Sequence, residues 1–407
     1  MKDTGEFCRM NILLIGNGFD LAHGLPTKYT DFLKFIEVIK QIIDVDSKES
    51  LDQINWMNIH PEVKKKLLFN MGNIRDNLFS QKKMWKELID NNFWIEYFSQ
   101  CKTYQRENWI DFENEISYVI QQIDQDMNIV PLSGIKPGFN GEVNGLSNDY
   151  LNELYSQNVF VFQSSDKNVC ENKSITFKDI RDRLYSDLNK FIRAFEIYLT
   201  DYVEKKDCNI ISPDLKEILI AEKNSKEVLG CKILSFNYTN TCQRICLGKL
   251  NIDLKRHIDY IHGKADINNT IESNNMVLGI DEYLSEDRRN KDVEFIAFKK
   301  FYQRIYKGTG CEYKRWVDQI RRNENIDHEL YIFGHSLNVT DGDVLRDLIM
   351  NDNVYTTIYY YNKDVMGQQI ANLVKVIGQD ELIKRTGGRT KTIEFKQQQN
   401  MIIRYMV

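Results

Sequence analysis

Residues 11–27 read NILLIGNGFDLAHGLPT, in which a short apolar run leads directly into the glycine turn Gly16-Asn17-Gly18. The run at 11–15 has the length and composition of a buried strand. After the turn, residues 27–31 offer helix N-caps, and apolar residues then recur at helical spacing from Phe32 to Ile43. A strand, a glycine turn and a helix in this order form the phosphate-binding unit of doubly wound α/β folds. We therefore predict that Gly16, Asn17 and Gly18 bind ligand phosphates, although a tight turn without a ligand would also explain the two glycines.

Composition narrows the class of protein. A chain of 407 residues with 42% hydrophobic and 12% aromatic residues is not disordered, and its net charge of −5 gives no reason to expect nonspecific nucleic-acid binding. The eight cysteines include no CxxC pair, which indicates reduced structural thiols. We find neither a signal peptide nor the ~18 consecutive apolar residues of a membrane span. We expect a cytoplasmic protein with no membrane contact.

The periodicity divides the chain into segments of two kinds. Long helical patterns occupy 62–71, 83–100, 108–126 and 177–204. From residue 230 onward, short β-rich runs at 232–236, 258–261, 276–280, 330–333 and 354–361 alternate with helix-like stretches at 241–250, 341–350 and 363–377.

Strands that alternate with helices predict an α/β fold with a doubly wound, mostly parallel Rossmann-like sheet and a large helical insertion. We assign 1–45 and 230–380 to a nucleotide-binding α/β domain and 46–229 to a helical, regulatory domain. Residues 381–407 form a C-terminal extension, which either adds an edge hairpin or is partly mobile.

Polar residues follow two of the predicted strands. Asn237 comes directly after the run 232–236, and His262 comes directly after 258–261. In a parallel sheet both side chains can face one crevice at the carboxyl edge. An amide can orient a water molecule, and an imidazole can accept a proton near neutral pH. We predict that Asn237 and His262 are catalytic, although a turn or helix cap would also explain Asn237 and a structural role would also explain His262.

A second strand–glycine–hydroxyl turn, Gly334-His335-Ser336, suits contact with ribose or phosphate. Asp341 begins the next predicted helix, so it either belongs to this ligand-binding turn or is only the N-cap of that helix. Asp20 follows the first glycine turn and belongs to the same predicted binding set. Leu21 stands where a dehydrogenase fingerprint needs its third glycine, which disfavours a hydride-transfer enzyme.

Acidic residues elsewhere have structural explanations. The segment Trp109–Glu115 reads as a solvated helix face, with completion of the active site as the alternative. Asp281 and Glu282 follow a β-rich run and are of a type that binds metal, but no second carboxylate cluster of nuclease-like spacing accompanies them.

Five motifs together resemble the bacteriophage abortive infection family AbiH. They are IGNGFDLAHGLPT at 15–27, WIDFE at 109–113, SFNYTNT at 235–241, IHG at 261–263 and FGHSL at 333–337. The resemblance runs over almost the whole chain and implies a bacterial anti-phage protein.

The same landmarks are more distantly similar to the Sir2-type NAD-binding fold. Its glycine–alanine–glycine turn with a following glycine and proline is matched by Gly16, Gly18, Gly24 and Pro26; its strand-end asparagine by Asn237; its histidine–glycine by His262-Gly263; and its glycine–x–serine–leucine turn by Gly334, Ser336 and Leu337. The chain departs from that family at Asp20, where the family has serine, and in lacking a paired-cysteine zinc module. The resemblance therefore implies NAD hydrolysis rather than deacetylation.

On this resemblance the chain is an NAD glycohydrolase that depletes NAD on infection, with NAD as substrate and no metal. Asn237 holds the ribose and a water molecule, and His262 is the base. Gly16, Asn17 and Gly18 bind the pyrophosphate with Asp20 beside it, and Gly334, His335 and Ser336 lie on the adenosine side. The alternatives are a non-catalytic nucleotide-binding sensor and a metal-dependent nuclease that uses Asp20 and Asp281. We expect a phage-derived trigger, and the sequence leaves open whether the chain forms a homo-oligomer.

Overall fold

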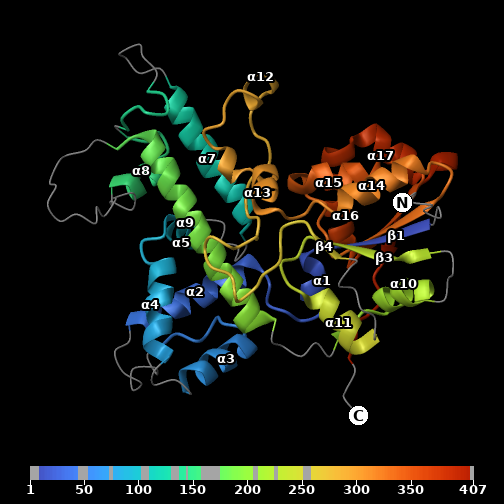
Figure 1. Cartoon of the computed structure of the whole chain (residues 1–407), viewed down its shortest axis with the longest axis horizontal. Coiled ribbons are helices and arrows are strands. Elements are labelled where there is room, and N and C mark those ends of the chain that lie inside the picture. Colours follow the sequence, from blue (N-terminus) through green and yellow to red (C-terminus); the bar gives the residue numbers. More distant parts are fainter. Residues whose placement is uncertain are drawn as a thin grey trace, which may run out of the picture. The chain divides into compact units, whose positions relative to one another are not determined.

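The computed structural model describes residues 9–44, 54–72, 77–101, 110–129, 137–143, 145–156, 175–204, 210–223, 228–250 and 258–403. The chain divides into two compact units (Figure 1). We call Met1–Lys28, Leu199–Ala265 and Lys307–Val407 the sheet unit, and Tyr29–Tyr198 with Asp266–Tyr306 the helical unit.

The sheet unit contains a six-stranded, fully parallel sheet in the order β4-β3-β1-β5-β6-β7. Its strands are β1 (Arg9–Ile15), β3 (Val228–Ser235), β4 (Ile258–Tyr260), β5 (His328–Phe333), β6 (Val354–Tyr360) and β7 (Ile393–Gln397). Numbered by position in the chain, this is the 3-2-1-4-5-6 order of Rossmann folds, in which the strand order reverses between β1 and β5. The predicted fold class is confirmed.

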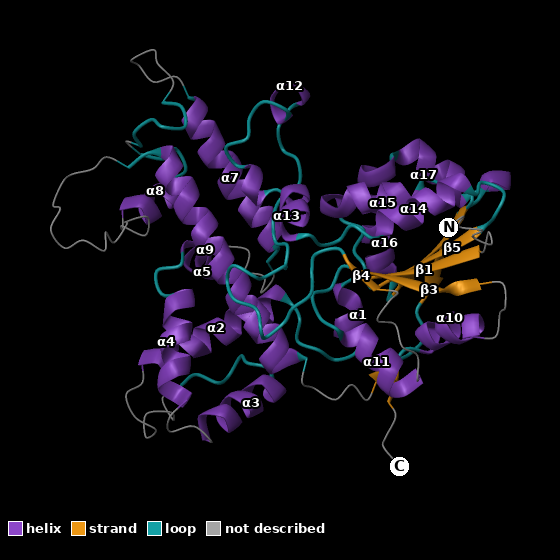
Figure 2. Ribbon diagram, in the orientation of Figure 1, coloured by secondary structure: helices purple, strands orange, loops and turns teal. Residues whose placement is uncertain are grey.

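Alternate residues of each strand serve two separate cores. In β1, Ile12 and Leu14 face one core, whereas Leu13 and Ile15 face the other. The first core is completed by α14 (Tyr313–Arg322), α15 (Gly342–Ile349), α16 (Lys363–Ile377) and α17 (Gln379–Thr386), and the second by α1 (Asn17–Ala22), α10 (Pro213–Lys223) and α11 (Thr241–Leu250). Figure 2 shows these two groups of helices on opposite faces of the sheet. A strand buried on both faces must be apolar throughout, which explains the continuous run at 11–15.

The helical unit is built on aromatic packing. Its principal helices are α2 (Tyr29–Asp44), α3 (Pro61–Gly72), α4 (Asn77–Ile89), α5 (Phe93–Gln100), α7 (Phe112–Asn128), α8 (Asp149–Ser156) and α9 (Phe177–Ile197), with the short helices α12 (Glu286–Arg289) and α13 (Lys300–Lys307). Phe32 on α2 is fully buried and its ring lies 5.4 Å from Phe191 and 4.9 Å from Phe195 on α9. Because this aromatic face packs on α9, α2 groups with the helical unit rather than with the α/β domain assigned from the sequence.

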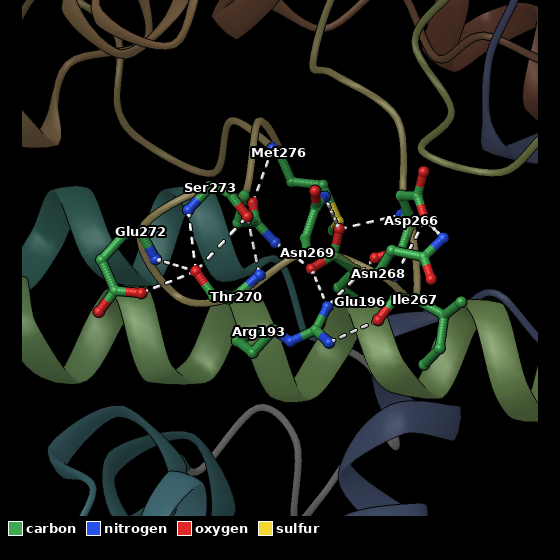
Figure 3. A network of polar contacts seen from close by, with 11 residues as sticks. Arg193, Glu196, Asp266, Ile267, Asn268, Asn269, Thr270, Glu272, Ser273 and Met276 are labelled. Carbon is green, nitrogen blue, oxygen red and sulfur yellow. Dashed lines mark hydrogen bonds and ion pairs between the residues drawn. The ribbon is translucent and has the colours of Figure 1, made fainter.

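A buried glutamate fixes the loop 266–276 of the helical unit (Figure 3). Glu196 is 0% exposed, and its carboxylate accepts hydrogen bonds from the Asp266 amide at 2.9 Å and from Asn269 Nδ2 at 2.6 Å. Arg193, one helical turn earlier, pairs with Glu196 at 2.5 Å and donates to the carbonyl of Ile267 at 2.9 Å. A buried carboxylate is tolerated only when its charge is paired and hydrogen-bonded, and this network meets that requirement.

Two secondary-structure predictions were wrong. Residues 276–280 do not form a strand, because the Gln303 side chain bonds both the amide and the carbonyl of Leu278, each at 3.1 Å, in place of a neighbouring strand. The helix predicted over 83–100 is interrupted, because Asn91 takes a left-handed backbone (φ 52°) and Asn92 caps α5 through the amides of Trp94 and Ile95.

The C-terminal segment belongs to the sheet unit. β7 pairs parallel to β6 as the sixth strand, and β8 (Ile402–Ile403) pairs antiparallel to β2 (Ile210–Ile211). α9 continues directly into a π-helix over Tyr198–Val203. None of the helices in the described ranges is both long and apolar enough to cross a membrane.

Candidate functional site

The carboxyl ends of four strands lie in register. Ile15 pairs with both Ser235 and Phe333, and Ser235 pairs with Tyr260. The residues two positions beyond these four strand ends are Asn17, Asn237, His262 and His335. All four were candidates from the sequence, and the parallel register places them after the same row of the sheet. This edge is where ligands bind in doubly wound folds.

The two glycine turns contact each other where the strand order reverses. The amides of Gly16 and Gly18 donate to the carbonyls of Phe333 at 3.1 Å and of Gly334 at 2.8 Å. A Cβ on Gly18 would lie 2.8 Å from the Gly334 oxygen, and one on Gly334 would lie 2.2 Å from the Phe19 nitrogen. Packing between the turns thus explains these glycines without a ligand. Phosphate binding here stays a prediction, and it would need donors other than the Gly16 and Gly18 amides.

Asn17 and Ser336 are both exposed, and each makes a hydrogen bond that fixes the turn in which it lies. Asn17 accepts a hydrogen bond from the Thr27 hydroxyl at 2.6 Å and donates to the Thr27 carbonyl at 3.3 Å, which closes the segment after α1. The carbonyl of Ser336 accepts from Asn372 Nδ2 at 2.9 Å. The predicted ligand contacts of Asn17 and Ser336 remain untested predictions.

Asp20 contacts the loop that carries Asn237. It is 1% exposed, and its Oδ2 accepts a hydrogen bond from the Thr239 hydroxyl at 2.6 Å, which in turn accepts one from Thr241 at 3.0 Å. Burial raises the pKa of Asp20 to about 6, and Thr239, Thr241 and the neighbouring Asn237 amide oppose that rise. Asp20 is therefore an interior carboxyl whose pKa burial raises toward neutrality.

The side chain of Asn237 is buried with unused hydrogen-bonding capacity. It is 5% exposed, and neither its Nδ2 nor its Oδ1 makes a hydrogen bond of normal geometry within the described chain. The same holds for Oδ1 of Asp20. A buried polar atom left without a partner costs about 1–3 kcal/mol, so such atoms are rare and require an explanation.

A second buried carboxyl, not predicted from the sequence, lies near Asp20. Glu204 follows the π-helix, and its Oε1 accepts the Asn240 amide at 2.7 Å. Burial raises the pKa of Glu204 to about 7; the Asn240 amide, Arg244 and Lys264 oppose the rise, and Asp20 adds to it. Nothing in the local sequence pattern marks Glu204, because it reaches the β3–α11 loop only through the fold.

Asp341 lies between the two candidate histidines. Its Oδ1 is 3.3 Å from Nε2 of His262, and its Oδ2 is 3.3 Å from Nε2 of His335. All three residues are buried. Asp341 occupies the position before α15, but its side chain makes no capping hydrogen bond. Asp341 is therefore the N-cap of α15 by position, as the sequence allowed, while its side chain contacts the two histidines.

Hydrogen bonding fixes the orientation of His335. Its Nδ1 accepts the Leu337 amide at 2.9 Å, so the proton of the neutral ring sits on Nε2, which faces Asp341. Leu337 itself has a left-handed backbone (φ 59°), a strained conformation of the kind found at functional sites. The ring of Phe236 packs edge-on against both histidines, with centroids 5.4 Å from His262 and 4.4 Å from His335.

The residues on either side of Asn237 both have their rings near His262. Phe236 packs on the His262 ring, and the Tyr238 ring lies 6.1 Å from it. The structure thus gathers Asp20, Asn237, His262 and His335 at one edge of the sheet and adds Asp341, Thr239 and Glu204, which sequence reasoning left out of the site.

The acidic segment at 109–115 is structural where it is described; Trp109 lies outside the described residues. Asp111 caps α7, Glu115 accepts the Tyr97 hydroxyl at 2.9 Å, and Glu113 pairs with the buried Lys300 at 2.7 Å. These contacts replace the expected solvated face. All of these partners belong to the helical unit.

Metal binding finds no support in the part of the chain that the structure describes. No group of three or more histidine, cysteine, aspartate or glutamate side chains there could hold an ion. Glu282 instead binds Lys299 through both carboxylate oxygens, at 2.8 and 2.9 Å. Of the cysteines in the described ranges, Cys101, Cys231, Cys242 and Cys311 form no disulfide.

A protein-family model matches most of the chain. The family model described as "Bacteriophage abortive infection AbiH" matches residues 12–361, a range that includes every strand from β3 to β6 and every residue of the site. No protein with a curated description matches the chain.

Proposed function

The chain belongs to the bacteriophage abortive infection family AbiH, and on that premise we propose that it arrests infected cells by hydrolysing NAD. The bond that breaks joins the nicotinamide nitrogen to C1′ of its ribose. Water adds to C1′ and loses a proton, which gives nicotinamide, ADP-ribose and H⁺.

One observation carries this proposal: a buried, hydrogen-bond-deficient amide and an imidazole backed by a carboxylate follow neighbouring strands at the ligand edge of a Rossmann-type sheet. Asn237 has both a donor and an acceptor to offer. The Asp341–His262 contact gives the imidazole a fixed orientation and a negative charge behind it. Water orientation and proton removal are what hydrolysis of this bond requires of protein side chains.

The residues divide the work as follows. Asn237 orients the attacking water and a ribose hydroxyl. His262 accepts the proton, and Asp341 stabilises the imidazolium that forms, as a carboxylate does behind a catalytic histidine. His335, whose proton faces Asp341, holds the carboxylate in place from the other side.

The test is incubation of the purified full chain with NAD, with and without a phage lysate, followed by quantification of nicotinamide. We expect His262→Ala and Asn237→Ala each to lose release by ~10²–10⁴-fold, the usual range for general-base assistance. His328→Ala is the matched control, because His328 is equally buried but lies at the start of β5, where its Nδ1 accepts the Met10 amide. Bound but intact NAD, or full release by a folded His262→Ala chain, would refute the proposal.

A further inference from the structure

Asp20 and Asn237 come from different strand ends but share one neighbourhood. Asp20 lies on α1 after β1, and Asn237 lies in the loop after β3, the strand paired with β1. The Asn237 side chain lies near enough to lower the pKa of Asp20, and the Thr239 hydroxyl from the same loop donates to Oδ2 of Asp20. The fold therefore occupies Oδ2 of Asp20 and leaves Oδ1 without a hydrogen bond in the described chain.

The unused atoms form a defined set. Asp20 Oδ1 and Asn237 Oδ1 are acceptors, and Asn237 Nδ2 is a donor. Both residues are at least nine-tenths buried. A ligand that satisfies the set must donate two hydrogen bonds and accept at least one, from groups small enough to lie together.

These hydrogen-bonding requirements can be compared with what each part of a nucleotide offers. Phosphate oxygens only accept hydrogen bonds and carry negative charge, so a phosphate here would meet repulsion from the Asp20 carboxylate and would find one donor, Asn237 Nδ2. The carboxamide of nicotinamide offers two N–H donors and a carbonyl acceptor, and ADP-ribose, which lacks nicotinamide, separates this candidate from ribose in the test below. The 2- and 3-hydroxyls of ribose are two adjacent donors, each of which also accepts, and carboxylates bind ribose hydroxyls in other Rossmann-type folds.

We propose that Asp20 and Asn237 form a subsite for the cis-diol of a ribose, and that Asp20 makes the chain selective for ribonucleotides over their deoxy counterparts. This replaces the position beside the phosphates expected for Asp20. It rests on the proposed function only for the choice of an ADP-ribosyl ligand.

The test compares ADP-ribose with its analogue that lacks the 2-hydroxyl of the terminal ribose, by titration calorimetry on the full chain. The two ligands differ by one hydrogen bond to a charged acceptor, so the analogue should bind at least about tenfold more weakly. Asp20→Asn should reduce that difference to within about threefold. Asp364→Asn, the same substitution at an exposed position on α16, should leave it unchanged.

Equal affinity of the native chain for the two ligands would overturn the proposal, as would the absence of ADP-ribose binding at millimolar concentration. The native comparison decides this even if Asp20→Asn fails to fold. Because the assay needs no hydrolysis, discrimination without nicotinamide release would leave the diol subsite standing and refute the glycohydrolase. Release of nicotinamide without discrimination would do the reverse.

Discussion

Substitution of Gly18 separates the two explanations of the glycine turn. A Cβ at this position would lie 2.8 Å from the Gly334 oxygen and 2.9 Å from the Gly334 Cα, both backbone atoms that cannot rotate away. Overpacking of this kind costs ~1–3 kcal/mol, while the gain in helix propensity from glycine to alanine returns ~0.5–1 kcal/mol. We expect Gly18→Ala to lower the free energy of unfolding by about 1–2 kcal/mol.

Gly367 provides the matched control. It lies inside α16, and a Cβ there would meet no atom within 4 Å, so Gly367→Ala should raise the free energy of unfolding by ~0.5–1 kcal/mol. Urea unfolding followed by circular dichroism measures both, and thermal midpoints should move in opposite directions by ~2–4 °C per kcal/mol. If Gly18→Ala is as stable as the native chain but loses nucleotide affinity, the packing argument is wrong and the turn serves the ligand.

Two further outcomes follow from the buried carboxyls. Asp341→Asn should slow nicotinamide release by about 10²-fold while ADP-ribose affinity stays within about twofold, because Asp341 acts through His262; a parallel loss of affinity would contradict that role. The folded pKa of Asp20, about 6, lies above its ordinary 3.8, so the stability contributed by its neutral form is present below about pH 4 and is lost as the pH rises through 6. The native chain should therefore lose about 1 kcal/mol relative to Asp20→Asn between pH 5 and 7.5 in urea unfolding, and parallel pH profiles would show that Asp20 does not titrate there.

The sheet was predictable because its strands are buried on both faces. Continuous apolar runs ending in glycine or polar residues placed the carboxyl ends of β1, β3, β4 and β5 to within one residue. The same rule failed at 276–280, which is equally apolar and buried but has its backbone bonded by the Gln303 side chain. Apolar character reports burial and not the partner of the backbone, so the pattern could not distinguish these cases.

The site was predictable only in part, for a related reason. Asn237 and His262 could be predicted because they directly follow predicted strands. Asp341 lies at the start of a helix, where aspartate is common because it caps helices. Its partner His262 follows β4, and β3 and β1 lie between β4 and β5 in the sheet. Glu204 is hidden in the same way, since its contact with Asn240 depends on where the π-helix ends. Local patterns carry no information about such long-range contacts.

The strand register makes the four residues beyond the strand ends equally good candidates for ligand contact. Their hydrogen bonds distinguish them. The side chain of Asn17 forms hydrogen bonds to Thr27 through both of its amide atoms, and His335 accepts a hydrogen bond from the Leu337 amide. Both side chains therefore stabilise the fold. Asn237 is as buried as His335 yet has no hydrogen bond of normal geometry from its amide in the described chain, an arrangement that lowers stability unless something else binds there. A fold keeps such a group when binding a ligand compensates for the loss. We therefore expect the substrate to bind at the side-chain amide of Asn237 rather than at the glycine turn Gly16-Asn17-Gly18.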